Sequence, residues 1–283
     1  PEIDIGICGT NIVLAAQSPA GVATPMRDAW QAMARRAIAA SLEAWQSRAR
    51  IAALEKSALL LAEHDVVVVA SKVVAKAENR YVDLRQVEPS AQARELAAQT
   101  GKDPRVVEVI LWDTELVSRC TRDALIVRHH GGHVSANAGL DQSNALPAHA
   151  APDTGPWVLR LPANADASAA ALRAALEAHF GVHLAVLVSD SFGRPFRMGT
   201  LGTAIGVSGL PAVEDHRGRR DLDGRALEHT VTATADQLCA AADLVCGQAD
   251  EARAAVVVRG LRFEPVAGSA LDLCRRREGD LYV

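Results

Sequence analysis

Asp65-Val66-Val67-Val68-Val69-Ala70 is the stretch that decides the fold. Its four consecutive valines lack the alternation of a strand with one wet face, so they predict a strand buried on both faces. Two similar apolar runs follow, at residues 184–188 and 254–258. Segments with helical composition separate the three runs, which places the chain in a mixed class, α/β or α+β.

The segments around these runs predict further helices and strands. Helices are expected at residues 25–61 (one or two), 90–99, 104–123, 165–180 and 230–245. Strands are expected at 124–128, 133–136 and 157–161, the first two joined by a turn at residues 129–132. Gly101 should end the helix before it, and Asp166 or Ser168 should cap the one that starts near Ala165. The segment 193–224 is expected to be long and irregular.

Composition excludes several classes of protein. The 283 residues are 49% apolar, and 34 acidic against 30 basic residues give a net charge of -4, so no nucleic-acid stripe or polybasic membrane patch is expected. We find no apolar run long enough to span a bilayer and no secretory pattern near Pro1, and we therefore expect a cytoplasmic protein. Five cysteines without CxxC spacing argue against a disulfide framework or a structural zinc site.

Ser71, Lys72 and Lys76 directly follow the valine run. Ligands bind at the carboxyl ends of strands in open α/β sheets, and lysine is a point charge for phosphate, so these residues are candidates for an anionic ligand. The plainer alternative is a solvated junction with surface lysines, and spacing alone favours it. No GxxxxGK[ST] motif is present, so this is not a Walker site.

Two carboxylates stand out further along the chain. Asp141 lies between Asn137 and Asn144, and these oxygen donors suit Mg²⁺ or Mn²⁺, although an Asx-rich turn explains them equally well. Asp190 follows a buried strand, where an isolated charge needs a partner or a metal. An ion pair of Asp190 with Arg194 or Arg197 is the alternative, and we place the functional interpretation somewhat ahead of it.

Two further groups carry weaker signals. Residues 247–251, Gly-Gln-Ala-Asp-Glu, fit an ordinary polar loop between a helix and a strand. His129, His130 and His133 are spread over a predicted hairpin and lack the helical spacing and the glutamate of a zincin. We therefore expect these histidines to be structural.

Several of these segments, in this order, resemble the coenzyme F420:L-glutamate ligase family. The matching motifs are Val66-Val-Val-Val-Ala-Ser-Lys-Val-Val-Ala-Lys76, Thr100-Gly-Lys-Asp-Pro-Arg105, Ala136-Asn-Ala-Gly-Leu-Asp-Gln-Ser-Asn144, Ser189-Asp-Ser-Phe-Gly-Arg-Pro-Phe-Arg197, Gly218-Arg-Arg-Asp-Leu-Asp-Gly224 and Leu244-Val-Cys-Gly-Gln248. The resemblance covers about residues 65–262. Each motif alone is weak, but the ordered set is highly specific.

The resemblance implies roles for individual residues. Ser71, Lys72, Lys76 and Asn144 match GTP contacts. Asp141 and Asp190 match the ligands of a first metal ion, and Ser191 and Gln248 match ligands of a second. A nucleotide-binding loop is matched by Val245, Cys246, Gly247, Gln248, Ala249, Asp250, Glu251 and Ala252.

The resemblance also implies a reaction. GTP would phosphorylate the terminal carboxylate of the coenzyme F420 precursor, and L-glutamate would displace phosphate from the acyl phosphate, with Mg²⁺ or Mn²⁺ as cofactor and K⁺ as a further candidate ion. No side chain is required as a covalent nucleophile. Proteins of the family form a homodimer with intertwined subunits, so the resemblance implies a homodimer here too. We expect no nucleic-acid or membrane partner.

Departures from the family pattern lie mainly in the first part of the chain. Residues 1–64 are expected to be an atypical, mostly helical region, and residues 65–283 the ligase domain, with room for two subdomains. Asn79, Asp223 and Gln237 also differ from the family motifs. Two alternatives stay open: a nucleotide-dependent ligase for another carboxylate, and a nucleotide-binding homologue without turnover.

Overall fold

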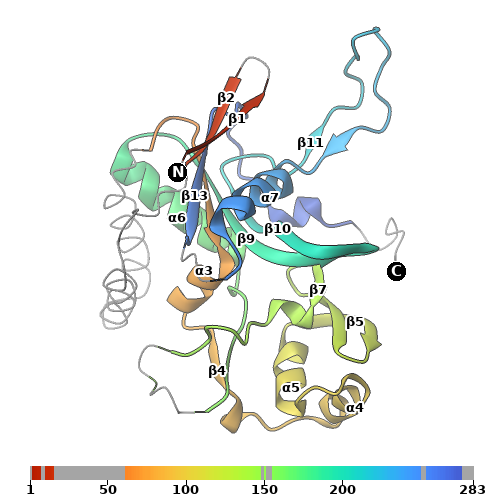
Figure 1. Ribbon diagram of the computed structural model, residues 1–283. Helices are drawn as coiled ribbons and strands as arrows, with labels where there is room; N and C mark the ends of the chain where they lie inside the picture. Colours follow the sequence, from red (N-terminus) through yellow and green to blue (C-terminus); the bar gives the residue numbers. More distant parts are fainter. Residues whose placement is uncertain are drawn as a thin grey trace.

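The computed structural model describes residues 2–7, 10–15, 61–147, 150, 155–249 and 253–275. Its main feature is a six-stranded mixed sheet with the strand order β1-β2-β13-β3-β9-β10 (Figure 1). The strands are β1 (Glu2–Ile7), β2 (Thr10–Ala15), β3 (Val66–Ala70), β9 (Ala185–Arg194), β10 (Arg197–Ser208) and β13 (Ala255–Arg259). β3 and β9 are parallel, whereas the other neighbours in the sheet are antiparallel. The class is therefore mixed α and β, as the sequence predicted.

Both faces of the sheet are covered by helices. Val66 and Val68 belong to a core formed with α7 (Thr234–Cys246), and Val67 and Val69 belong to a second core formed with α6 (Ala165–Phe180). All four valines are at most 4% exposed. Because successive strand residues point to opposite faces, this division confirms that the valine run is buried on both sides.

The segment 193–224 differs from its prediction. β9 continues past Ser191 to Arg194, and β10 then runs back antiparallel to it from Arg197 to Ser208. The glycines that suggested a loop instead allow helices to approach: a Cβ on Gly202 would lie 2.4 Å from the Cys239 carbonyl oxygen of α7, and one on Gly206 would lie 2.3 Å from that of Ala165 in α6. Glycine within a strand can mark close backbone approach, and it does so here. The arm beyond carries β11 (Glu214–Asp215) and β12 (Val231–Thr232).

A smaller unit packs below the main sheet in Figure 1. It contains α4 (Ala91–Thr100), α5 (Pro104–Trp112) and a three-stranded sheet of β5 (Thr114–Thr121), β6 (Ala124–His129) and β7 (Val134–Ala136). The expected helix 104–123 is thus wrong beyond Trp112, because residues 114–121 pair with β6 instead. The hairpin between β6 and β7 is confirmed.

Short elements connect the two units. α3 (Ser71–Ala77) follows β3 directly, and β4 (Tyr81–Asp83) pairs with β8 (Trp157–Leu159). The 3₁₀ turns are η2 (Leu84–Gln86), η3 (Asn137–Gly139) and η4 (Ala270–Leu273). The strand expected at 157–161 is therefore confirmed in its first three residues.

Helix caps show which side chains start and end the helices. Gly101 ends α4 in the left-handed conformation, with a φ of 74°, as predicted. The cap of α6 is Asn164, whose side chain accepts a hydrogen bond from the Ala167 amide, and not Asp166 or Ser168. Asp166 instead accepts from the backbone amides of Val207 and Ala270, so it joins β10 to the C-terminal segment.

The first sixty residues are described only in part. The β1–β2 hairpin was not predicted, and the helices expected at 25–61 lie almost wholly outside the described residues. Within the described part of the chain, none of the helices combines the length and apolarity that crossing a membrane requires.

Candidate active site beside β3 and β9

The parallel pairing of β3 and β9 brings two predicted groups together. Ala70 lies opposite Ser189 in the register, so Ser71 at the start of α3 comes next to Asp190. The Ser71 hydroxyl donates a hydrogen bond of 2.5 Å to Asp190 Oδ1. Ser71 is 3% exposed, so its hydroxyl is held out of solvent against β9.

Asp141 reaches the same place from a different segment. Its backbone amide and carbonyl both pair with Leu159 of β8, which anchors this turn beside α3. The Asp141 carboxylate lies 3.3 Å from Lys72 Nζ, and Lys72 also donates to the side-chain and backbone oxygens of Ser143. Both side chains of the ion pair are 30% exposed, and such a partly solvated pair stabilises by only about 1 kcal/mol or less. Lys72 is therefore able to exchange Asp141 for another anion at little cost.

The electrostatics of this group favour a bound cation. The pKa of Asp190 is raised to about 6, mainly by burial; the hydrogen bond from Ser71 opposes this shift, and the nearby charge of Asp141 adds to it. Burial also raises the pKa of Asp141, although Lys72 and Lys76 oppose that shift. Two carboxylates that resist ionisation become easier to ionise when a divalent cation lies between them.

Lys76 lies one helical turn after Lys72 on α3. Burial lowers the pKa of Lys76, the charge of Lys72 lowers it further, and Asp141 partly offsets both effects. Two lysines that repel one another beside a carboxylate suit an anionic ligand, and phosphate oxygens would satisfy both ammonium groups. Asn144 is exposed three residues after Asp141, in the left-handed conformation with a φ of 53°.

Ser191 and Gln248 meet on the other face of β9. Gln248 Nε2 lies 3.0 Å from the Ser191 hydroxyl oxygen, and Gly247, with a φ of 74°, ends α7 just before it. Both side chains also contact Asp243, which belongs to none of the motifs predicted to carry the site. The nearest sequence signal is an acidic residue in the last turn of an alanine-rich packing helix. Asp250, Glu251 and Ala252 of the predicted nucleotide loop lie outside the described residues.

The donor set limits the kind of metal that these residues could hold. Among the described residues, no group of three His, Cys, Asp or Glu side chains is placed to hold one ion. Asp141 and Asp190 would therefore be completed by a hydroxyl, water or phosphate oxygens. Mg²⁺ and Mn²⁺ accept this mixture, because they bind few carboxylates and share substrate phosphates.

The three histidines of the β6–β7 hairpin pack on one another. His129 and His133 stack with ring centroids 4.6 Å apart, and His133 stacks on Phe192 of β9 at 5.1 Å. Burial lowers the pKa of His133 to about 3, with the charge of His129 as a smaller cause, so this ring stays neutral. The stack joins the small unit to the strand that carries Asp190.

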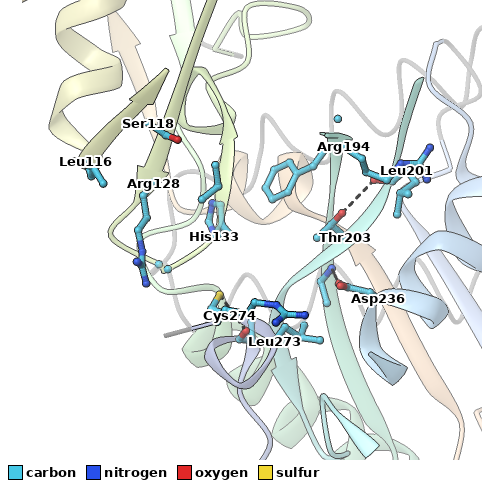
Figure 2. Close-up of a pocket in the computed structure, with 18 residues that line it drawn as sticks. Leu116, Ser118, Arg128, His133, Arg194, Leu201, Thr203, Asp236, Leu273 and Cys274 are labelled. Carbon is cyan, nitrogen blue, oxygen red and sulfur yellow. Dashed lines mark hydrogen bonds between the residues drawn. The ribbon is translucent and has the colours of Figure 1, made fainter. Parts of the chain in front are cut away.

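A cleft of about 440 Å³ lies between the small sheet and the β9–β10 hairpin (Figure 2). Figure 2 shows Arg128 and His133 on one side and Arg194, Leu201 and Thr203 on the other. None of the predicted metal or nucleotide residues lines this cleft. The polar contacts beside β3 and β9, and not this cleft, therefore define the candidate site.

Comparison with known proteins identifies the family of this chain. The family model described as F420-0:Gamma-glutamyl ligase matches residues 47–260. The chain is 48% identical over 204 residues to the coenzyme F420:L-glutamate ligase of Methanopyrus kandleri. The matched residues are 72% of this chain and 78% of that protein. This chain is 41% identical over 234 residues to the enzyme of the same name from Methanothermobacter thermautotrophicus, covering 82% and 90% of the two chains. The chain therefore belongs to the F420-0:gamma-glutamyl ligase family.

Proposed function

We propose that this protein is a GTP- and divalent-metal-dependent ligase that adds L-glutamate to the coenzyme F420 precursor. One observation carries the proposal: Ser71, Lys72 and Lys76 lie beside Asp141 and Asp190. These residues come from segments that are distant in sequence, and the pairing of β3 with β9 and of Asp141 with Leu159 of β8 brings the segments together. Family membership and the names of the relatives indicate the substrates.

Each group has a distinct role in this proposal. Lys72 and Lys76 bind the phosphates of GTP, and Lys72 leaves Asp141 to do so. Asp141 and Asp190 hold Mg²⁺ or Mn²⁺, with K⁺ as a further candidate ion. The bound metal neutralises charge on the phosphoryl group that is transferred. Ser71 keeps the Asp190 carboxylate oriented through its short hydrogen bond.

The chemistry then needs positioning more than a reactive side chain. The terminal phosphoryl group of GTP moves to the acceptor carboxylate and releases GDP. The glutamate amine attacks the acyl phosphate, the new C–N bond replaces the C–O bond to phosphate, and the amine loses its proton to solvent. We assign no covalent nucleophile among the described residues, and the buried Cys239 thiol, whose pKa is raised by burial, does not suit that role.

We also propose that the protein is a homodimer. The tip of the β9–β10 hairpin presents Phe196 and Met198, which are 94% and 98% exposed, and the β11–β12 arm presents Leu222. Figure 1 shows both extensions protruding from the main sheet. Apolar side chains on such extensions favour association with a second copy. Sedimentation equilibrium of the intact chain tests this, and a monomer at all concentrations contradicts it.

Mass spectrometry of the coenzyme tests the reaction. The F420 precursor is incubated with the protein, GTP, Mn²⁺ and L-glutamate, and we expect the mass of one or more glutamyl residues to be added. GTP turnover that depends on a different carboxylate would support the ligase with another acceptor. GTP binding without any turnover would identify a nucleotide-binding homologue.

A further inference from the structure

Asp243 contacts both residues that are expected to bind the second metal ion. Its Oδ1 atom accepts a hydrogen bond of 2.6 Å from Gln248 Nε2 and lies 3.5 Å from the Ser191 hydroxyl oxygen, a longer and weaker contact. Gln248 Nε2 also lies 3.0 Å from that hydroxyl oxygen. The three side chains form one closed group that joins the end of α7 to β9.

A glycine on β10 places Asp243 in this position. Gly202 lies opposite Ser191 in the β9–β10 register. A Cβ on Gly202 would lie 2.9 Å from the Asp243 Cβ, so a larger residue would push the last turn of α7 away. The Gly202 amide also donates a hydrogen bond to Asp243. The close approach of helix and strand thus fixes the carboxylate next to Ser191.

The contacts of Asp243 determine how the Gln248 amide is turned. An ionised carboxylate has only acceptors, so the NH₂ group of Gln248 faces Asp243, and its Oε1 atom points to the other side. Burial raises the pKa of Asp243, while hydrogen bonds from Gly202, Ser191 and Gln248 oppose that shift. The same carboxylate restrains the Ser191 hydroxyl. Two neutral oxygen donors are therefore oriented by one acid.

We propose that Asp243 is the positioning residue of the second metal site. It holds Ser191 Oγ and Gln248 Oε1 toward a common divalent cation, and it does so without binding the ion itself. Groups that orient metal ligands commonly change metal affinity about 10- to 100-fold when they are replaced. This inference rests on the proposed function, because that function supplies the second ion.

A structural role for Asp243 is the competing explanation, and the chain contains a matched control for it. Asp236 lies seven residues earlier on α7 and accepts a hydrogen bond of 2.9 Å from the Ala204 amide, as Asp243 does from that of Gly202. Both aspartates therefore bind backbone amides of β10, which is the last strand of the sheet. Asp236 differs in its partner: in the part of the chain that the structure describes, its carboxylate is hydrogen-bonded to Ala204 and not to Ser191 or Gln248.

The experiment compares Asp243→Asn with Asp236→Asn. Both changes keep an oxygen for the β10 amide. At position 243, however, the new NH₂ group attracts Gln248 Oε1, and the Gln248 amide then turns its own NH₂ group toward the metal. Mn²⁺ binding is followed by electron paramagnetic resonance with a non-hydrolysable GTP analogue. We expect two ions for the parent protein and for Asp236→Asn, whereas in Asp243→Asn one ion stays and the other weakens about 10- to 100-fold.

Each outcome separates this inference from the proposed function. Equal binding of two ions by both variants overturns the role of Asp243 and leaves the ligase proposal standing. A parent protein that binds one ion removes the second site alone, and one that binds none overturns both proposals. Thermal melting checks that the variants are folded. If Asp243→Asn unfolds, Asp243→Ser replaces it, because serine retains a polar group near Gly202 but is too short to reach Gln248.

Discussion

The two faces of β9 carry different kinds of polar group. Asp190 and Ser191 are adjacent in sequence, so their side chains point to opposite sides of the strand. On the first side, Asp190 lies beside Ser71, near Asp141, with lysines around them. On the second side, Ser191 meets Gln248 and Asp243. One strand thus presents a site with two carboxylates and two lysines on one face, and a site with one carboxylate beside a hydroxyl and an amide on the other.

This difference indicates how strongly each side should hold a divalent cation. Under the proposed function, two carboxylates on the first side would attract Mg²⁺ or Mn²⁺ directly, whereas a hydroxyl and an amide on the second side would depend on the phosphates of the nucleotide. Removal of a charge on the first side should therefore reduce metal binding and activity the most. The expected effects below decrease in that order.

Asp190→Asn should have the largest effect on activity. It keeps the shape of the side chain and removes one charge, so we expect turnover to fall about 100-fold or more and to recover only partly with excess Mn²⁺. The unliganded protein should melt at the same temperature or slightly higher, because the buried charge is unfavourable there. Asp123→Asn, in an exposed turn, is the control. Normal turnover with a lowered melting temperature would contradict the metal role.

Lys72→Ala and Lys76→Ala should come next. Each removes a charge-assisted contact to phosphate, which corresponds to a loss in GTP affinity of about 10- to 100-fold, with the fold intact. Isothermal titration with GTP measures this. Lys102→Ala is the control, because Lys102 lies in the connection between α4 and α5. Unchanged affinity in both variants would make the two lysines ordinary surface residues.

Metal binding on the first face of β9 should depend on pH. The pKa of Asp190 is about 6 in the folded protein, so Mn²⁺ binding to the first site should weaken as the pH falls through 6. The folded state then binds a proton that the unfolded state, with a pKa near 4, does not hold, so this group makes the unliganded protein more stable as the pH falls from about 6 to about 4. Asp190→Asn should abolish both effects. A pH-independent Mn²⁺ affinity of the first site between pH 5 and 7 would refute the assignment.

The sequence predicted the core of the fold well because the responsible residues are contiguous. The buried strand is marked by four consecutive valines at 66–69, and the helix 165–180 is marked by its composition over a few successive turns. Glycines misled the prediction at β10, since Gly202 and Gly206 serve contacts with helices that are distant in sequence. β5 was missed for a related reason: its partner β6, and not its own composition, decides its conformation.

The sequence motifs selected candidate residues one by one, but they did not predict how these residues are arranged. Local motifs selected Asp141 and Asp190, yet the ion pair of Asp141 with Lys72 and the hydrogen bond of Asp190 with Ser71 depend on how four segments meet. Asp243 was missed because its motif, an acid in an alanine-rich helix, is common on helix surfaces. Its importance follows only from the approach of α7 to Gly202.

The smallest expected effect tests whether the histidine stack contributes to the charged face. Phe192 follows Asp190 by two positions, so its ring lies on the same side of β9, and His133 packs on that ring. His133→Phe keeps an aromatic ring between His129 and Phe192 and removes the buried ring nitrogens. We expect GTP and Mn²⁺ affinities to stay within about twofold of the parent protein, because the stack supports β9 by packing alone.

The same variant should change how stability depends on pH. Burial holds the pKa of His133 near 3, below the value of about 6.5 in an unfolded chain, so the parent protein loses stability as the pH falls below about 6.5. His133→Phe should reduce the loss between pH 7 and pH 5 by about 2 kcal/mol, a difference of about 4–8 °C in melting temperature. A weakened Mn²⁺ affinity in this variant would instead show that the histidine stack positions Asp190. The two faces of β9 would then differ in the packing that holds their polar residues in place, as well as in charge.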